Sequence, residues 1–304
     1  MSHSLETGLT GRMRRFVEKP LHEKSRSVYA RWRKAFPKIP FPVRLPFGVW
    51  FIARDDYLGS TLTFDGFEPA ERAFVQRFLT PGMTVLDIGA HHGLYTLLAA
   101  KLVGPTGKVF AFEPSPRERK ALALNVTLNR CKNVSLQPLA LGGQEGLFDL
   151  HIAGDGMTGF NSFRPSVDAG KTLKVSVRVT TLDNWITATG IHRVDFIKLD
   201  VEGGELSVLS GARELLTRQP RPIILAEVED RRTAPWGYAA NEIVRNLAEA
   251  EFDWYELRED GSLTLLRAGA KELQANLVAV PRERKEEVLS GGTGVGRGVR
   301  DSDE

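Results

Sequence analysis

The sequence has little of what marks secreted, membrane-spanning or strongly charged proteins. Only one of its 304 residues is cysteine, Cys131, which excludes an internal disulfide and a cysteine zinc site. No run approaches the ~18 uninterrupted apolar residues of a membrane span, and the first residues lack the apolar run of a signal peptide. The formal net charge is only +3, which does not demand a polyanionic partner. We therefore expect a soluble, cytoplasmic protein without a transmembrane segment.

The two ends of the chain differ in composition from the long segment between them. Ten Lys and Arg residues but only three Glu lie in the first 40 residues, so residues 1–45 are expected to form a basic N-terminal arm. This arm is either solvated, or a contact for an anionic partner such as a phosphorylated substrate, a membrane surface or another subunit. Residues 283–304 are Gly-rich and polar, which predicts a disordered tail. Residues 46–282 remain as one globular domain.

Short apolar runs alternate with helical patterns through this domain. The runs predict five buried strands, at 84–88, 109–113, 134–140, 195–199 and 223–228. Helical spacing predicts helices between several of them and near the end, at 94–103, from 116 onward, at 205–216 and after 240. A strand-turn-strand at 252–266 and a last strand at 276–280 follow. This alternation predicts an α/β fold with a mostly parallel sheet, helices on both faces and an antiparallel edge.

Two local patterns refine this outline. Ser115, Pro116 and Glu118 form a Ser-x-x-Glu capping box with Pro in the first turn, which starts the second helix. The segment 142–179 is Gly-rich with short alternating runs, which predicts an antiparallel insertion beside the sheet. Residues 159–162 within it are the candidate flap that closes over a bound acceptor and excludes water.

The segment TVLDIGAHHGLYT (residues 84–96) carries the clearest ligand-binding signal. A strand ends in Asp87, a turn contains Gly89 and Gly93, and a helix follows. Ligands of open α/β sheets bind at the carboxyl ends of strands, and glycines let the backbone approach them closely. The helix start also offers unpaired N–H groups to an anion. The alternative is an Asp that only caps the next helix. The candidate cofactor contacts in this turn are Asp87, Gly89, Ala90, His91 and Gly93.

The spacing Asp-x-Gly-x-x-x-Gly differs from the Gly-x-Gly-x-x-Gly of dinucleotide sites. A pyrophosphate needs an anion cradle, whereas S-adenosylmethionine carries an amino acid and a cationic sulfonium, so an acid beside the turn is tolerated. The second strand ends at Glu113, where a carboxylate accepts hydrogen bonds from both ribose hydroxyls of an adenosine. We therefore predict S-adenosyl-L-methionine as the cofactor. The remaining predicted cofactor contacts are Pro114 beside Glu113 and Ala140 at the adenine edge of the third strand.

The fourth strand, in FIKLDVEGGEL (residues 196–206), carries charges that a buried strand rarely holds. Alternation places Lys198, Asp200 and Glu202 on one side of the strand. Unpaired charges in a core cost several kcal/mol, so these groups are expected to pair with one another or to open into a cleft. We interpret Asp200 and Glu202 as catalytic, because each can orient a nucleophile or take its proton, and Asp200 also as a cofactor contact. Glu227, near the end of the fifth strand, is placed to join them.

Histidines and metal ligands give weaker signals. His91 and His92 lie in the Gly89–Gly93 turn, where His91 is a third candidate for the catalytic base. The other histidines lack a matching carboxylate or histidine spacing, and two carboxylates alone do not establish a cation site. We therefore predict no metal site.

Taken together, these motifs resemble the FkbM-type methyltransferases. The segments DIGAHHGLYT, VFAFEPSPRERKALALNVTLN, VTTLDNW, VDFIKLDVEGGELSVLSGA and ANLVAVP carry the resemblance, which covers roughly residues 64–281. The resemblance implies a class I, Rossmann-like methyltransferase fold: a mostly parallel seven-stranded sheet with an antiparallel C-terminal strand and helices on both faces. It also implies S-adenosylmethionine-dependent methyl transfer to oxygen, often on a sugar or a specialised metabolite.

The resemblance also assigns individual positions. His91 stands where such turns usually have Asn, and Gly204 where Ala is usual; the second change is expected only to loosen the helix entry. The basic arm lies outside the likeness. The positions that match the family are Asp87, Gly89 and Gly93 of the cofactor turn, Glu113 for the ribose, Asn125 and Asn129 of the second helix, and Asp200, Glu202 and Gly203 of the fourth strand.

The function expected from these observations is O-methylation of a small-molecule or saccharide acceptor by direct displacement. Three alternatives remain open: a nucleic-acid methyltransferase that uses the basic arm, a NAD-type oxidoreductase on the same fold, and a cofactor-binding protein without turnover. Nucleic acid is disfavoured because no aromatic-plus-basic RNA-binding element is present. Homo-oligomerisation is left open by the sequence.

Overall fold

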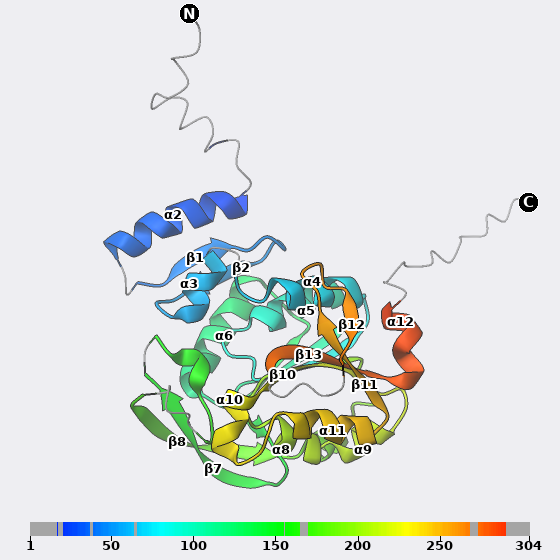
Figure 1. The fold of residues 1–304 in the computed structure, drawn as a ribbon. Coiled ribbons are helices and arrows are strands. Elements are labelled where there is room, and N and C mark those ends of the chain that lie inside the picture. The colour runs from blue at the N-terminus through cyan, green and yellow to red at the C-terminus, as the bar shows by residue number, and fades with distance from the viewer. Residues whose placement is uncertain are drawn as a thin grey trace, which may run out of the picture.

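The computed structural model describes residues 17, 21–36, 39–63, 66–154, 156–164, 170–267 and 273–289 (Figure 1). The expectations for residues 1–16 and 290–304 therefore lie outside the described residues. Among the helices that the structure describes, none combines the length and the apolarity that crossing a bilayer requires.

One large sheet organises the molecule. Its strand order is β12-β11-β13-β10-β9-β3-β4-β5. The central strands run parallel to one another: β5 (Val134–Gln137), β4 (Lys108–Phe112), β3 (Thr84–Ile88), β9 (Phe196–Leu199) and β10 (Ile223–Glu229). The remaining strands add antiparallel pairings: β13 (Gln274–Pro281), β11 (Phe252–Leu257) and β12 (Leu263–Leu265). The expected seven strands are present, and the count is corrected to eight because the turn at Gly261, with φ 75°, folds β12 back onto β11.

Alternating side chains of these strands fill two apolar cores, one on each face of the sheet. On one face Val85, Val109 and Phe196 pack against α4 (Pro69–Phe78) and α5 (Leu94–Val103). On the other face Leu86 and Ile197 pack against four helices: α7 (Leu182–Thr189), α8 (Glu205–Ser210), α9 (Arg213–Thr217) and α11 (Asn241–Glu249). Burial on both faces explains why the central strands read as continuous apolar runs. The predicted α/β architecture, with helices covering both faces, is confirmed.

Two predicted elements are each divided in the structure. The expected strand 134–140 stops at Gln137, because Pro138 lacks an amide hydrogen for a ladder bond, and the chain resumes as β6 (Ala140–Leu141) in another sheet. The expected helix 205–216 is broken at Gly211, where a Cβ atom would lie 2.2 Å from the carbonyl oxygen of Gly142. The first break therefore has a local cause, and the second a close contact with a neighbouring segment.

The start of α6 (Pro116–Leu128) follows its predicted position but not its predicted cap. The Ser115 hydroxyl donates to the Glu118 carboxylate instead of accepting a backbone N–H of the helix. The Ser-x-x-Glu pattern therefore locates the helix start, while the reciprocal capping box is wrong.

The predicted antiparallel insertion forms a separate small sheet. Its strand order is β6-β8-β7, in which β7 (Gly146–Ala153) and β8 (Thr172–Thr180) are antiparallel. The short helix η1 (Thr158–Phe160) lies between these two strands in the chain. In Figure 1 this sheet lies beside the main sheet, on the side away from α2 and β1.

The ends of the described chain pack on the domain. Helix α2 (Leu21–Ala35) lies against the hairpin of β1 (Phe41–Arg44) and β2 (Trp50–Ala53), and its Tyr29 belongs to the first core (Figure 1). The expected boundary at residue 45 falls in the turn of that hairpin. Residues 282–289, at the start of the expected tail, form η4 (Arg282–Arg284) and α12 (Lys285–Leu289). The division into arm, domain and tail stays a prediction.

The remaining helices border the carboxyl edge of the sheet, the edge at which parallel strands end. Helix α3 (Tyr57–Thr63) follows β2, while α10 (Asp230–Thr233) and η3 (Ala234–Trp236) follow β10. These three helices and the small sheet surround the carboxyl ends of β3, β4, β9 and β10, where a site is expected for this kind of fold.

Candidate active site

A cavity of about 930 Å³ lies at the carboxyl edge of the main sheet, between that edge and the small sheet. Its volume is suited to a cofactor and an acceptor of small-molecule size. Nine of the ten predicted site residues line it: Asp87, Gly89, Ala90, His91, Glu113, Pro114, Ala140, Asp200 and Glu202. The tenth, Gly93, caps α5 and lies against Leu122 instead.

The turn after β3 is shaped by close backbone packing. Gly89 has φ 86°, and a Cβ atom there would lie 1.7 Å from the carbonyl oxygen of Asp200. Glycine is therefore required for the turns after β3 and β9 to meet. His91, with φ 49°, adopts a left-handed conformation unusual for a side chain of its size. The turn that was predicted to bind a ligand is thus held in an uncommon backbone geometry.

Glu113 lies at the end of β4 and is only 6% exposed. Its two carboxyl oxygens accept hydrogen bonds from the backbone amides of His91 and Ser115, each at 2.8 Å. Burial, and then the nearby Glu118, raise its pKa to about 8. Each oxygen has a second lone pair, so the group retains acceptor capacity toward the cavity.

Asp87, at the end of β3, is 2% exposed and accepts the Thr96 hydroxyl of α5. Burial raises its pKa to about 6, opposed by the Thr96 bond and by Lys198. The contact with Thr96 favours a role in ordering the turn and the following helix, the alternative that the sequence left open.

Lys198 is a buried cation on β9 with several partners. Its Nζ donates to Asp200 at 3.1 Å and to the side chain of Asn276 at 3.3 Å. Burial lowers its pKa, but Asp200 and Glu68 oppose that effect and the net shift is upward. Glu68 in turn accepts bonds from Tyr95 and Asn276, and burial raises its pKa. Sequence reasoning missed Glu68 and Asn276, because no motif links positions so distant in the chain.

Three carboxylates converge on one arginine at one side of the cavity. The Nε of Arg232 lies 3.2 Å from Glu202 and 3.9 Å from Glu227, both of which line the cavity, and 3.4 Å from Glu229. Burial, followed by Asp200, raises the pKa values of Glu202 and Glu227 well above their usual range. One oxygen of Glu227 is buried and accepts no hydrogen bond from the described residues. Arg232 was missed from the sequence.

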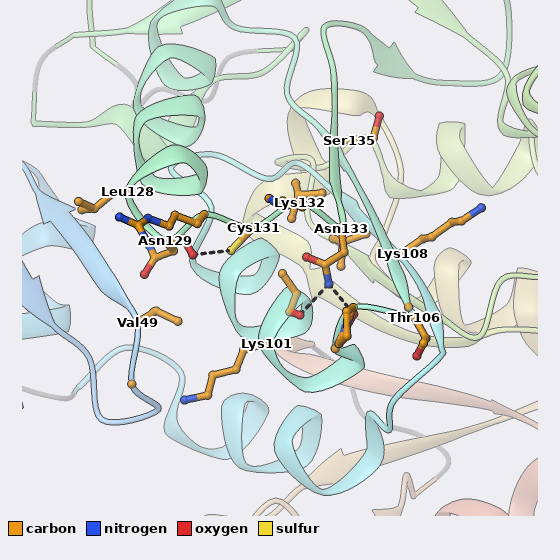
Figure 2. A pocket seen from close by; sticks show the side chains of 18 of the residues that line it. Val49, Lys101, Thr106, Lys108, Leu128, Asn129, Cys131, Lys132, Asn133 and Ser135 are labelled. Atoms are coloured by element: carbon orange, nitrogen blue, oxygen red, sulfur yellow. Dashed lines mark hydrogen bonds between the residues drawn. The ribbon is translucent and has the colours of Figure 1, made fainter.

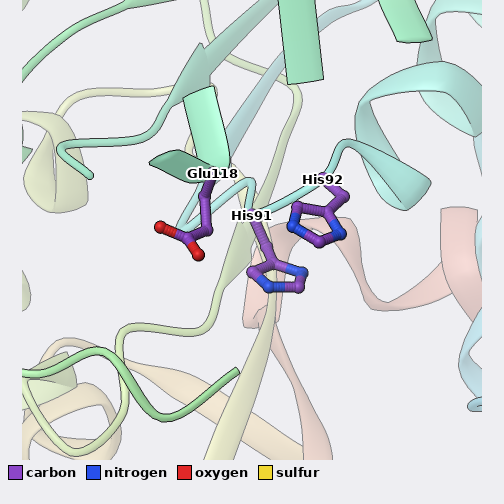
Figure 3. A group of neighbouring side chains, drawn as sticks. All are labelled: His91, His92 and Glu118. Carbon is purple, nitrogen blue, oxygen red and sulfur yellow. The ribbon is translucent and has the colours of Figure 1, made fainter. Parts of the chain in front are cut away.

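The two histidines of the turn stack on each other, as Figure 3 shows, with ring centroids 3.9 Å apart. Burial lowers the pKa of His91, and burial together with His91 lowers that of His92 to about 2, so both rings are neutral. The Nε2 atom of His91 is buried and has no hydrogen-bond partner among the described residues. A neutral imidazole with a free nitrogen can accept a proton.

Two groups of side chains have the composition of metal ligands. One is His91, His92 and Glu118, and the other is Asp200, Glu202 and Glu227, in each of which the ligand atoms lie within 4.8 Å of one another. In the first group the rings are nearly parallel, and Glu118 already binds Ser115 and Arg117. In the second group Arg232 supplies a positive charge. That no metal is bound stays a prediction.

The candidate flap forms one wall of the cavity. The guanidinium of Arg232 lies 4.4 Å from the ring centroid of Phe160. The Ser162 hydroxyl and the Trp236 indole both donate to the carbonyl oxygen of Glu202, at 2.9 and 3.2 Å. Trp236 also packs over Gly204, where a Cβ atom would lie 3.0 Å from the indole. Glycine at this position therefore makes room for an aromatic wall, rather than only loosening the helix entry.

The cavity carries an excess of acidic groups. Three lysines or arginines line it among the described residues, and the seven carboxyl groups that do so are Glu68, Asp87, Glu113, Asp149, Asp200, Glu202 and Glu227. Carboxyl oxygens accept hydrogen bonds from hydroxyl donors, and an acidic lining disfavours a pyrophosphate. These groups fit the sulfonium and ribose of S-adenosylmethionine better than they fit NAD.

Comparison with known proteins finds methyltransferases among the relatives of this chain. The 2-O-methyltransferase NoeI of Sinorhizobium fredii is 28% identical over 159 residues, which cover 48% of this chain and 64% of NoeI. The 31-O-demethyl-FK506 methyltransferase FkbM of Streptomyces tacrolimicus is 27% identical over 179 residues, which cover 50% of this chain and 67% of that protein. The chain thus spans about two thirds of the length of these curated relatives.

A solved structure and a family model extend the comparison. The crystal structure of a methyltransferase FkbM from Methylobacillus flagellatus aligns with 78% of this chain and 56% of its own, at 16% identity and a TM-score of 0.42. A family model, described as the methyltransferase FkbM domain, matches residues 87–253, from the end of β3 into β11. Because this match covers more than half of the chain, the protein belongs to the FkbM methyltransferase domain family.

Proposed function

We propose that this protein is an S-adenosylmethionine-dependent O-methyltransferase whose acceptor is a hydroxyl of a sugar, a glycoconjugate or a specialised metabolite. The observation that carries the proposal is a single cavity that joins the Gly89 turn and Glu113 to the carboxylates of Asp200, Glu202 and Glu227. The names of NoeI and of the FK506 enzyme, which specify O-methylation, support the same chemistry.

The donor half of the cavity is formed by the ends of β3 and β4. Glu113 would accept hydrogen bonds from ribose hydroxyls through its spare lone pairs. Ala140, with Phe112 and Leu139, offers an apolar surface for the adenine. When bound, S-adenosylmethionine supplies an electrophilic methyl group carried by a cationic sulfur.

The acceptor half lies between Asp200, Glu202 and Glu227 and the wall of Phe160 and Trp236. Carboxylates accept hydrogen bonds from hydroxyl groups, and aromatic rings cover the apolar faces of a sugar-like molecule. A hydroxyl that attacks a methyl group must lose its proton, and a carboxylate with a raised pKa is a stronger base than an ordinary one. Glu227 therefore joins Asp200, Glu202 and His91 as a candidate for that role, and much of the rate would come from positioning.

The donor assignment is tested by ligand-induced thermal stabilisation. A ligand at about 100 times its Kd adds roughly 2.7 kcal/mol to the apparent free energy of unfolding. S-Adenosylhomocysteine should raise the melting temperature, while NADH should leave it unchanged. Stabilisation by NADH alone would instead support the oxidoreductase alternative.

The reaction is tested by offering sugars and hydroxylated metabolites with labelled methyl donor and recording the mass gain. With an active acceptor in hand, Asp200→Asn, Glu202→Gln, Glu227→Gln and His91→Asn should identify the base by a 10²–10⁴-fold loss of kcat. Donor affinity should be retained in Glu202→Gln and Glu227→Gln, whereas Asp200 and His91 are also predicted donor contacts, so binding of S-adenosylhomocysteine is measured in parallel for all four. Glu229→Gln is the matched control, because Glu229 contacts Arg232 without lining the cavity. Full activity in all four variants would refute proton transfer by these groups.

A further inference from the structure

A second cavity, of about 940 Å³, lies at the opposite edge of the sheet (Figure 2). Its lining comes from the turn of the β1–β2 hairpin, the loop between α5 and β4, and the segment between α6 and β5. These segments meet where the parallel strands begin, whereas the candidate active site lies where they end. We call this cavity the amino-edge groove.

The charge of the amino-edge groove is of one sign. Among the described residues that line it, none is Asp or Glu. Five of the lining side chains are cationic: Arg44, Lys101, Lys108, Arg130 and Lys132. The last four are exposed. Three of them, Lys108, Arg130 and Lys132, form no ion pair with any residue that the structure describes.

Five positive charges in one groove exceed the formal net charge of +3 for the whole chain. Cations near helix C-termini often only balance the helix dipole, and α5 and α6 both end here. Each helix end supplies about half a negative charge, so roughly four positive charges remain uncompensated. The groove therefore has more charge than its helix ends require.

The walls of the groove are held by hydrogen bonds. The Asn133 amide donates to the carbonyl oxygens of Ala100 and Gly104, each at 2.8 Å, which fixes the loop before β4 (Figure 2). The Asn129 amide donates to Trp50, and Lys101 donates to the carbonyl oxygen of Phe47 at the hairpin turn. The concave shape is thus built into the fold and does not depend on a ligand.

The lining favours phosphate groups over nucleic-acid bases. Its two aromatic rings are already engaged, because Arg44 lies over Trp50 at 5.5 Å and Phe110 packs edge-on against Trp185 at 5.1 Å. These contacts reduce the ring surface of Trp50 and Phe110 that is left for stacking a base. We propose that the amino-edge groove binds a compact polyphosphate group, free or carried by a nucleotide. This inference is independent of the proposed methyl transfer.

The experiment is a calorimetric titration of the full chain with sodium tripolyphosphate at low and at physiological ionic strength. We expect saturable binding of one molecule per chain that weakens with salt, because the contacts are exposed charges. A double variant, Lys108→Glu with Lys132→Glu, should weaken binding at least about 10-fold, since each charge-assisted contact contributes about that factor or more. It should leave S-adenosylhomocysteine binding unchanged, because neither lysine lines the other cavity.

The matched control reverses two exposed cations away from both cavities, Lys171→Glu with Arg213→Glu, and should retain tripolyphosphate binding. A parallel titration with ATP distinguishes the sources: tighter binding than tripolyphosphate indicates a nucleotide, and equal binding a free polyphosphate. Absence of binding at low salt, or equal loss in both double variants, overturns the proposal. Tighter binding of a single-stranded oligonucleotide than of either phosphate compound also overturns it, in favour of a nucleic-acid site.

Discussion

The two carboxyl oxygens of Glu113 accept backbone hydrogen bonds that shape the fold, and the same oxygens are proposed to bind the ligand. Each oxygen accepts one backbone amide, from His91 and from Ser115, so the carboxyl links the turn after β3 to the start of α6. The lone pairs that remain face a cavity. One residue thus couples the shape of the donor site to the groups that would bind the donor.

Replacement of Glu113 tests this coupling directly. Glu113→Gln should lower the affinity for S-adenosylhomocysteine about 10- to 100-fold, because an amide offers one acceptor oxygen where the carboxylate offers two. Calorimetric titration measures the change. Asp149→Asn, which neutralises an exposed acid on the small-sheet wall of the same cavity, is the control and should bind normally. Equal affinity in the two variants would contradict the ribose assignment.

Gly89 makes a second prediction at this scale. Gly89→Ala should cost about 3 kcal/mol or more of the free energy of unfolding, because the new methyl would meet the Asp200 carbonyl at an unfavourable φ. Gly159→Ala, with nothing within 4 Å of the new atom, should stay within about 0.5 kcal/mol of the parent. Urea denaturation compares both. A small effect at Gly89 would mean that the turns after β3 and β9 separate easily.

The predicted site residues were recoverable from the sequence where they follow a strand directly. Glu113 and Asp200 each stand at such a position, Asp87 is the next-to-last residue of its strand, and the topology brings all three to one edge. Arg232 and Glu68 were not recoverable, since their roles depend on which distant side chains they meet. A contact between side chains that lie far apart in the chain leaves no local sequence pattern from which it could be predicted.

At the scale of elements, Asn125 of α6 and Asn129 directly after it form hydrogen bonds with β2 that a neighbouring strand would otherwise form. The Oδ1 atoms of Asn125 and Asn129 accept the backbone amides of Ile52 and Trp50, at 2.8 and 2.7 Å. One edge of β2 pairs with β1, and these side chains satisfy amides of the other. A spacing of four residues along a helix thus matches alternate residues of a strand. Asn125 and Asn129, the two asparagines that match the family, therefore attach the hairpin of β1 and β2 to the end of α6.

Removal of this attachment should destabilise the protein. Asn125→Leu should cost about 2–4 kcal/mol in urea denaturation, because it leaves a buried amide of β2 and the carbonyl oxygen of His92 without partners. Leu124→Ala, on an exposed position of the same helix, should cost less than about 0.5 kcal/mol. Similar losses in both variants would show that the hairpin is held by apolar packing instead.

The elements themselves were predicted well where burial dictates the pattern. The strands β3, β4, β9 and β10 and the helices α5 and α11 agree with the predicted segments within a few residues. One error is the break of the third strand, where the local effect of Pro138 was overlooked. The other is the break of the helix at Gly211, where close contact with Gly142 overrides the helical pattern. The antiparallel edge hairpin was predicted from its own residues as a strand-turn-strand, and only the family pattern of seven strands leaves β12 out.

For the molecule as a whole, several buried acids have raised pKa values. Burial is the first cause in each case, and it brings the pKa to about 8 at Glu113, about 7 at Glu205 and about 6 at Asp87. An acid whose folded-state pKa is raised binds protons more tightly in the folded chain. Its contribution to stability is therefore complete below the unfolded pKa and is lost as the pH rises through the folded pKa.

The free energy of unfolding should consequently fall between pH 6 and pH 9, by about 2–5 kcal/mol if the three acids act independently. Denaturation with urea at a series of pH values measures this profile. In Glu113→Gln the fall should be visibly shallower, since this group has the highest of the three pKa values. A profile that rises toward pH 9, or one unchanged by the substitution, would contradict the assignment.

The small sheet has a consequence for how enzymes of this shape diversify. Residues 140–141 and 179–180 are paired partners, so the chain enters and leaves the β6-β8-β7 unit at neighbouring points. A segment whose two ends lie side by side can be replaced by another of different length, because the replacement begins and ends at the same two points of the main domain. Grafting the equivalent segment of a relative between these anchors would therefore replace the proposed acceptor wall while leaving the main sheet and the proposed donor site unaltered.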